Sequence, residues 1–314
     1  MLSGPTGKMN SIQKPVHAGV TIFKEYPLEE LADFINWSYF FHEWRLNGKF
    51  PAIFNDPVKG EEAAKLFADA QQMLELIVKE KWISANGTAG IFPANAVGED
   101  IEVYSTEAPD KIRTTFNFLR NQQQQENKPN YCLSDFIAPK KSGITDYIGC
   151  FAVTSGIGIE KKVDEFINAY DDYSAIMLKI LADRLAEAFT EVLHLKVRKE
   201  LWGYAADEDL SLDELHLGKY RGIRPAPGYP ACPDHSGKAE ILRLLNATEN
   251  TGISLTETFM MNPAASVCGW YFANPHATYF SVGKISKEQV IDYAQRKKIS
   301  IEEAEKWLAP VIGY

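Results

Sequence analysis

Residues 224–235 read RPAPGYPACPDH, and this stretch governs how the rest of the chain is interpreted. Its four prolines in twelve residues exclude both a helix and a central strand, because proline fixes φ and lacks the N–H that either ladder needs. The stretch opens with Arg224, turns at Gly228 and Tyr229, and closes on a Cys-x-x-His pair. It is therefore a stiff connector, a metal site or a binding loop.

The pair Cys232 and His235 argues against a metal site. A structural zinc ion needs four ligands, usually as two pairs at matched spacing, and the sequence contains no second pair. A cysteine nucleophile with a histidine base would need a further group to orient the base, and neither residue has an obvious one. We therefore assign no metal ligand and no catalytic residue here.

Residues 224–229 fit a binding loop and a rigid surface corner equally well. Prolines on both sides of Ala226 keep the backbone extended, so regular structure does not use all of its N–H and C=O groups. Gly228 can adopt a positive φ and let a ligand approach closely. Arg224 offers a bidentate fork for a carboxylate, and Tyr229 a flat face with a polar tip. A loop of this kind suits a small zwitterion.

The composition narrows the class of protein. The 314 residues carry a net charge of -9 without a basic run, which argues against a nucleic-acid partner. Four separated cysteines without a CxxC pair suit free thiols in a reducing cytosol. No apolar run is long enough for a membrane span, and the polar start has no export signal. We therefore predict a cytoplasmic, soluble protein without a nucleic-acid or membrane partner.

The hydrophobic patterning predicts an α+β fold with an antiparallel sheet, since helices and strands occur without a regular βαβα rhythm. Residues 61–80 and 171–200 are predicted as helices, the second central and largely buried. Predicted strands are residues 89–92, 101–104, 111–119, 146–153, 253–261 and 277–285, the last two flanking the segment 265–275. Residues 1–17 are predicted to be a flexible tail, and residues 18–314 the domain.

Other chemical motifs have simpler structural explanations. Gly156-x-Gly158 follows a strand, but Lys161 stands where a dinucleotide site has its third glycine, which favours a β-to-α turn. The adjacent carboxylates at 99–100 and 171–172 point apart, so capping and solvation explain them better than acid–base chemistry. The aromatic run at 37–44 is typical of core packing.

Seven further segments share a resemblance with the loop. In order and spacing, the chain from about residue 18 resembles the activation domain of cobalamin-dependent methionine synthase, whose signature is Arg-x-x-x-Gly-Tyr. The segments are FPANAVGEDIEVY, NYCLSDFIAPK, DYIGCFAVT, DDYSAIMLKILADRLAEAF, WGYA, LTETFMMNPAASVCGWYF and EKWLAP. The resemblance implies a C-shaped single α+β domain, in which helices flank a twisted antiparallel sheet.

The resemblance also implies a function. The chain would bind S-adenosylmethionine and support the reductive remethylation of cob(II)alamin. The cobalamin would be held by a partner, a methionine synthase or a related corrinoid protein, and a flavodoxin-type donor would supply the electron. The chain would then be one component of a 5-methyltetrahydrofolate–homocysteine methyltransferase system.

Ligand roles are implied residue by residue. Arg224 would bind the methionine carboxylate, and the backbone at Ala226 and Gly228 would meet polar edges of the ligand. Tyr229 would lie near the sulfonium and face the corrin. The remaining implied positions are the cofactor contacts Tyr279, Phe280 and Glu187, and Asp183, which shares a helix face with Glu187 and would lie near the imidazole displaced from cobalt.

One position departs from the family pattern. Relatives usually have aspartate in an Ile-Asp-Trp context, where it contacts the ligand's ammonium, but this chain has Ile35-Asn36-Trp37. Asparagine still accepts a hydrogen bond but lacks the charge, so we expect weaker binding. The alternative hypothesis is a docking protein for a corrinoid partner that has lost or weakened its cofactor binding.

The homocysteine, folate and cobalamin modules of a methionine synthase are not recognisable in this sequence. It has no Asp-x-His-x-x-Gly cobalamin motif, since PDHSG at 233–237 fails in spacing, and no clustered cysteines for the homocysteine zinc. The chain is either a fragment or a free-standing reactivation protein. The polar N-terminus favours the second.

Overall fold

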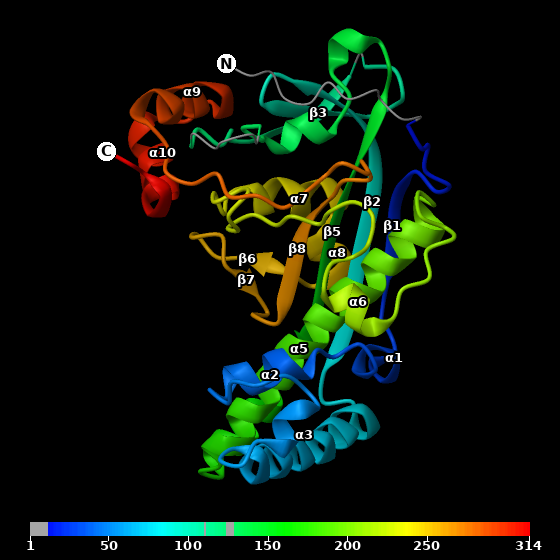
Figure 1. The fold of residues 1–314 in the computed structure, drawn as a ribbon, viewed down its shortest axis with the longest axis vertical. Coiled ribbons are helices and arrows are strands. Elements are labelled where there is room, and N and C mark those ends of the chain that lie inside the picture. Colours follow the sequence, from blue (N-terminus) through cyan, green and yellow to red (C-terminus); the bar gives the residue numbers. More distant parts are fainter. Residues whose placement is uncertain (1–11, 110, 124–128) are drawn as a thin grey trace.

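A six-stranded antiparallel sheet forms the centre of the molecule (Figure 1). The structure, a computed structural model, describes residues 12–109, 111–123 and 129–314. The sheet has the order β4-β3-β2-β5-β8, and β1 pairs with the opposite half of the long strand β2. The strands are β1 (Gly19–Phe23), β2 (Ser84–Val97), β3 (Asp100–Tyr104), β4 (Ile112–Asn117), β5 (Asp146–Ile157) and β8 (Ser266–Tyr271), and a separate ribbon joins β6 (Ser254–Leu255) to β7 (Met261–Asn262).

Helices cover both faces of this sheet. They are α1 (Leu28–Ala32), α2 (Trp37–Glu43), α3 (Gly60–Glu80), α4 (Ile159–Asn168), α5 (Asp172–Lys196), α6 (Leu212–His216), α7 (Gly237–Leu245), α8 (Ala247–Thr251), α9 (Lys287–Lys297) and α10 (Ile301–Leu308). Phe151 and Val153 of β5 belong to the core under α5, whereas Cys150 and Ala152 belong to the core under α7. Because successive strand residues face opposite sides, both faces of β5 are buried. The α+β prediction is confirmed.

The long helix α5 is placed by a cap at its start and by small residues in the sheet. Asp171 accepts a hydrogen bond from Ser174 N at 3.0 Å, as an N-cap does. A β-carbon at Gly87 would lie 2.7 Å from the ring of Phe189, so glycine lets α5 lie close to the sheet. The helix continues as one π turn at Val197–Leu201, which confirms the predicted helix at 171–200.

The predicted strands near the C-terminus need a correction. Residues 277–285 form no strand, and the segment predicted as their connector contains the sheet strand β8. Burial explains the error, because every residue of β8 except Val267 is buried, so the strand shows no alternation. The expected turn is confirmed, since Gly158 leads into α4 with φ +87. Of the aromatic run at 37–44, Phe40 and Phe41 lie in the core as expected, whereas Tyr39 is exposed.

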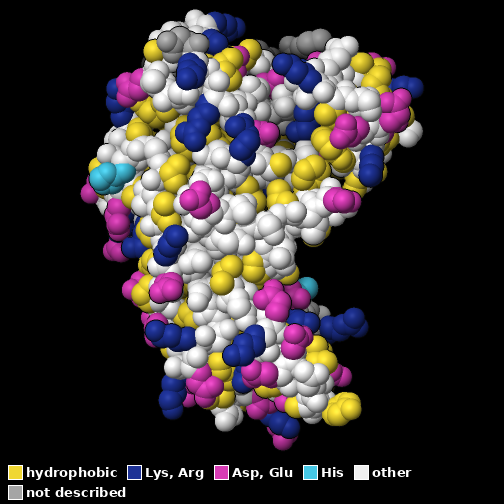
Figure 2. All heavy atoms as spheres, turned by 180° about the vertical axis from the view of Figure 1, so that it is seen from behind, with side chains coloured by type: hydrophobic (Ala, Val, Ile, Leu, Met, Phe, Trp, Pro, Cys, Tyr) yellow, Lys and Arg dark blue, Asp and Glu magenta, His cyan; other side chains and the backbone are white. Residues whose placement is uncertain are grey.

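The molecule is hollowed on one flank, as Figure 2 shows. The notch separates the lobe with α9 and α10 from the lobe formed by α2, α3 and the start of α5. This is the predicted C shape.

Residues 1–11 of the predicted tail lie outside the described residues. In the rest of the tail, His17 N donates to Leu201 O at 2.8 Å and Gln13 O accepts from Trp202 Nε1 at 2.9 Å. None of the described helices is long and apolar enough to cross a membrane.

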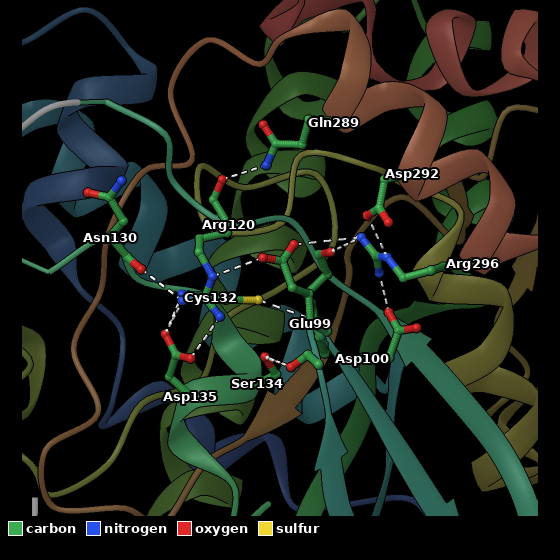
Figure 3. Close-up of polar contacts among 12 residues, drawn as sticks. Glu99, Asp100, Arg120, Asn130, Cys132, Ser134, Asp135, Gln289, Asp292 and Arg296 are labelled. Carbon is green, nitrogen blue, oxygen red and sulfur yellow. Dashed lines mark hydrogen bonds and ion pairs between the residues drawn. The ribbon is translucent and has the colours of Figure 1, made fainter. Parts of the chain in front are cut away.

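An ionic network fastens α9 to the turn between β2 and β3 (Figure 3). Arg296 pairs with Asp100, with Asp292 at 2.8 Å and with Glu99 at 3.8 Å. Glu99 also accepts from Arg120 Nε at 2.9 Å, so it bridges the two arginines. The carboxylates at 99–100 are therefore bound in a network, where the sequence suggested solvation.

Replacing Arg296 should destabilise the protein. Arg296→Ala leaves Asp100 half-buried without its cation, so we expect the free energy of unfolding to fall by about 2–4 kcal/mol. Arg243→Ala is the matched control, because Arg243 forms an exposed pair with Glu240 and such pairs contribute about 0–1 kcal/mol. Urea unfolding measures both, and equal losses would contradict the prediction.

Candidate functional site

The proline-rich loop lies along β8 as a short continuation of the sheet. Ile223 and Phe272 exchange both backbone hydrogen bonds, and Trp270 N donates to Pro225 O at 2.9 Å. A β-carbon at Gly269 would lie only 2.6 Å from Pro225 O, so the glycine is required for this close approach. The loop is thereby fixed at its arginine end.

The turn that follows is equally tight. Gly228 N donates to Cys232 O at 2.8 Å, and Cys232 N donates to Tyr229 O at 2.9 Å. Gly228 has φ +92, and a β-carbon there would lie 2.2 Å from the His235 ring. The left-handed backbone and the packed histidine both require glycine at this position.

Arg224 reaches from this loop to α5. Its Nη1 donates to Glu191 Oε2 at 2.9 Å, its Nη2 bonds to Glu191 Oε1, and Nη1 also lies 3.3 Å from His194 Nδ1. The guanidinium stacks over Tyr220 with 5.3 Å between Cζ and the ring centroid. The predicted carboxylate-binding arginine is therefore already paired with a carboxylate of the protein.

A row of carboxylates on α5 faces the loop. Asp183, Glu187 and Glu191 follow one another at four-residue spacing and share a helix face. Burial raises the pKa of Glu187, and the neighbouring carboxylates of Asp183 and Glu191 add to this, while Arg184 and Arg224 oppose it. Asp183 itself pairs with Arg184. The site therefore combines one cation of the loop with an acidic helix face.

Two tyrosines present exposed rings beside Arg224. Tyr229 is 58% exposed, and burial of its hydroxyl together with the charges of Glu187 and Asp183 raises its pKa. Tyr279 is 51% exposed, and its hydroxyl accepts from Arg224 N and bonds to Tyr220 OH, both at 3.0 Å. These aromatic faces lie open next to the acidic row.

The other predicted positions have mixed surroundings. Ala226 O accepts from Tyr229 N at 3.3 Å, whereas the Ala226 N–H has no protein acceptor within the described residues. Phe280 packs against Tyr131 and Phe136, so its ring packs on the core under α7. Asn36 caps α2 by accepting from Ser38 N at 3.2 Å. The ligand roles of these three residues stay predictions.

The two members of the Cys-x-x-His pair have different surroundings. Cys232 is buried, which raises the pKa of its thiol well above the ordinary value and disfavours a nucleophilic thiolate. His235 lies 3.0 Å from Lys238 Nζ, and burial together with this lysine lowers the pKa of the histidine. In the described part of the chain, no group of three or more His, Cys, Asp or Glu residues is placed to bind a metal.

Sequence reasoning missed the residues behind Arg224. His194 is fully buried, with Nε2 3.2 Å from Tyr204 OH and its ring stacked on Tyr271 at 5.0 Å. Glu191 was detectable as the next step in the spacing of Asp183 and Glu187. No sequence signal indicated that the loop would lie against this part of α5.

A family profile and a solved structure both match this chain over most of its length. The profile of the family described as vitamin B12 dependent methionine synthase, activation domain, matches residues 27–298. A crystal structure of the MetH reactivation domain bound to AdoHcy is similar to this chain, with 49% sequence identity and a TM-score of 0.95. The similarity covers 97% of this chain and 94% of that one.

The buried histidine should make stability depend on pH. Burial, with the charges of Arg224 and Arg198, holds the pKa of His194 well below its ordinary value, so the folded protein keeps it neutral. The unfolded chain takes up this proton near pH 6.5, so stability is present above that pH and is lost as the pH falls.

We expect His194→Gln to remove up to about 1.4 kcal/mol per pH unit from the slope of unfolding free energy below about pH 6. Urea unfolding between about pH 7.5 and 5.5 measures this slope. His276→Gln, the same change at an exposed histidine, is the control variant. An unaltered slope in His194→Gln would contradict the assignment.

Proposed function

Because this chain belongs to the family of vitamin B12-dependent methionine synthase activation domains, we propose that its site binds S-adenosylmethionine for the reductive remethylation of a corrinoid held by a partner. The single observation that carries the ligand class is the cation of Arg224 beside the row Asp183, Glu187 and Glu191. This arrangement complements a ligand with one carboxylate and two cationic groups. The related MetH domain bound to AdoHcy supports it.

The donor set fits such a ligand. The guanidinium of Arg224 would bind the carboxylate, and the N–H of Ala226, which has no acceptor among the described residues, would donate to another polar edge of the ligand. Glu187 would attract the ammonium or sulfonium, and its raised pKa reflects a burial cost that a cationic ligand would offset. When bound, S-adenosylmethionine supplies the methyl group, and its sulfonium becomes the neutral thioether of S-adenosylhomocysteine.

The exposed side chains suggest how a partner docks. Tyr229 and Tyr279 present aromatic faces that suit the flat face of a corrin, and the part-exposed Asp183 is the proposed acceptor for the displaced imidazole. The partner is a cobalamin-binding domain of a methionine synthase or another corrinoid protein, and a flavodoxin-type protein is the proposed electron donor. The cysteines of the described residues are free and buried, which suits the cytoplasm.

Calorimetric titration with S-adenosylmethionine and S-adenosylhomocysteine tests the ligand. We expect both to bind the wild type and Arg224→Gln to weaken both by about 100-fold, because a charge-assisted pair is lost. Arg224→Lys keeps the charge and should bind in between, while Arg243→Gln, at an exposed arginine that pairs with Glu240, should match the wild type.

Binding to a cobalamin-loaded partner distinguishes a reactivation module from a docking protein without a cofactor. A cobalamin-loaded methionine synthase fragment should bind more tightly when S-adenosylmethionine is present. A docking protein without a cofactor would bind this partner equally well with and without the ligand, and equally well as Arg224→Gln. That result, together with no ligand binding, would overturn the proposal.

Restoring the family residue should strengthen binding. Asn36→Asp keeps the cap of α2, since aspartate caps helices as well as asparagine does. It adds a charge for the ligand's ammonium, so we expect affinity for S-adenosylhomocysteine to rise roughly five-fold. The deaminated analogue is the control ligand, and an equal gain for both compounds would show that the charge does not act on the ammonium.

A further inference from the structure

The pairing of Arg224 with Glu191 leaves a specific part of the guanidinium available. A guanidinium is planar and carries five N–H donors in a fixed arrangement. Glu191 takes the two donors that Nη1 and Nη2 direct away from the side chain, in an end-on bidentate pair. His194 Nδ1 lies 3.3 Å from Nη1 and meets its second donor.

The histidine must be the acceptor in this contact. Because arginine only donates, the 3.3 Å approach of Arg224 Nη1 requires a lone pair on His194 Nδ1. The ring proton then lies on Nε2, which donates to Tyr204 OH at 3.2 Å. Burial of His194 disfavours the charged ring, so the histidine is neutral and one of its two nitrogens keeps a lone pair.

This support is rigid. Glu191 and His194 are buried on α5, with exposed fractions of 8% and 0%. The imidazole is stacked on Tyr271 at 5.0 Å and meets Tyr220 edge-on at 4.7 Å. Neither side chain can follow a ligand outward without breaking this packing, so the plane of the guanidinium is fixed before any ligand binds.

One edge of the Arg224 guanidinium remains available for a ligand. Its Nε–H and the second N–H of Nη2 lie side by side, and within residues 12–109, 111–123 and 129–314 neither donates to a protein acceptor. The arginine side chain retains 16% exposure. These two parallel donors match the two oxygens of one carboxylate.

We infer that Glu191 and His194 are positioning residues, which fix Arg224 so that a ligand carboxylate binds side-on to the Nε/Nη2 edge while the Arg224–Glu191 pair stays intact. The inference rests on the proposed function, since it concerns the carboxylate of the same ligand. It assigns Glu191 the role of a support, and not that of a competitor that the ligand displaces. Glu191 itself does not touch the ligand.

The test compares two ligands that differ in one group. S-adenosylhomocysteine carries the carboxylate, and its decarboxylated analogue keeps the amine and the nucleoside. Glu191→Asp retains the charge but shortens the side chain by one methylene, so the guanidinium is drawn back or released. We expect the affinity for S-adenosylhomocysteine, relative to that for the decarboxylated analogue, to fall about ten-fold. The fall comes from weaker binding of S-adenosylhomocysteine only.

The control variant is Glu165→Asp, the same change in an exposed pair with Lys162, and it should leave the ratio unchanged. Melting temperatures establish that each variant is folded. A ratio in Glu191→Asp equal to that of the wild type would overturn the inference while leaving the proposed function standing. Failure of the wild type to bind either ligand would overturn both.

A spectroscopic measurement identifies the edge directly. In ¹⁵N spectra of the arginine Nε–H groups, the resonance that disappears in Arg224→Lys belongs to Arg224. We expect S-adenosylhomocysteine to shift this resonance and the decarboxylated analogue to leave it in place. If neither ligand shifts it while S-adenosylhomocysteine binds, the carboxylate uses another edge and the inference is wrong. This readout does not depend on whether Glu191→Asp folds.

Discussion

The buried pair of Arg224 and Glu191 is the interaction on which the site depends. Removing two charges from water is costly, and their attraction offsets this only when the geometry is good and the remaining donors are satisfied. That condition requires the loop and α5 to be held at a fixed separation. Backbone bonds from β8 to Ile223 and Pro225 hold the loop, and the sheet holds α5 through Phe189 over Gly87. The glycines at 87 and 269 are therefore as necessary to the site as the charged residues.

The composition of the loop follows from this constraint. A segment that must present backbone and an arginine to a ligand cannot be a strand or a helix, yet it must not be flexible. Proline restricts φ without needing hydrogen-bond partners, and Gly228 permits the reversal against the ring of His235. The Cys-x-x-His pair, which suggests metal chemistry in the sequence, packs behind this reversal.

The sequence predicted most of the secondary structure and the loop, but few of the contacts between residues that are far apart in the chain. The long helix, the antiparallel sheet and the loop follow from periodicity, proline content and resemblance. The strand β8 was missed because burial on both faces removes alternation. Glu191 and His194 were missed because they meet Arg224 across 33 and 30 residues, and helix periodicity places them on a face without showing what covers it. Tertiary pairing of this kind has no signature in one sequence.

The far end of the loop is anchored to a different part of the molecule, and this links stability to the site. Asp234 is buried and accepts from Tyr293 OH of α9 at 2.6 Å and from Ser236 N at 2.7 Å. Since Arg296 fastens α9 to Asp100 at the start of β3, the turn after Tyr229 is held through α9 and the ionic network. The arginine end of the loop is held instead by β8 and α5. A perturbation of α9 should therefore displace Tyr229 before it displaces Arg224, because only the tyrosine lies on the side of the turn that α9 supports.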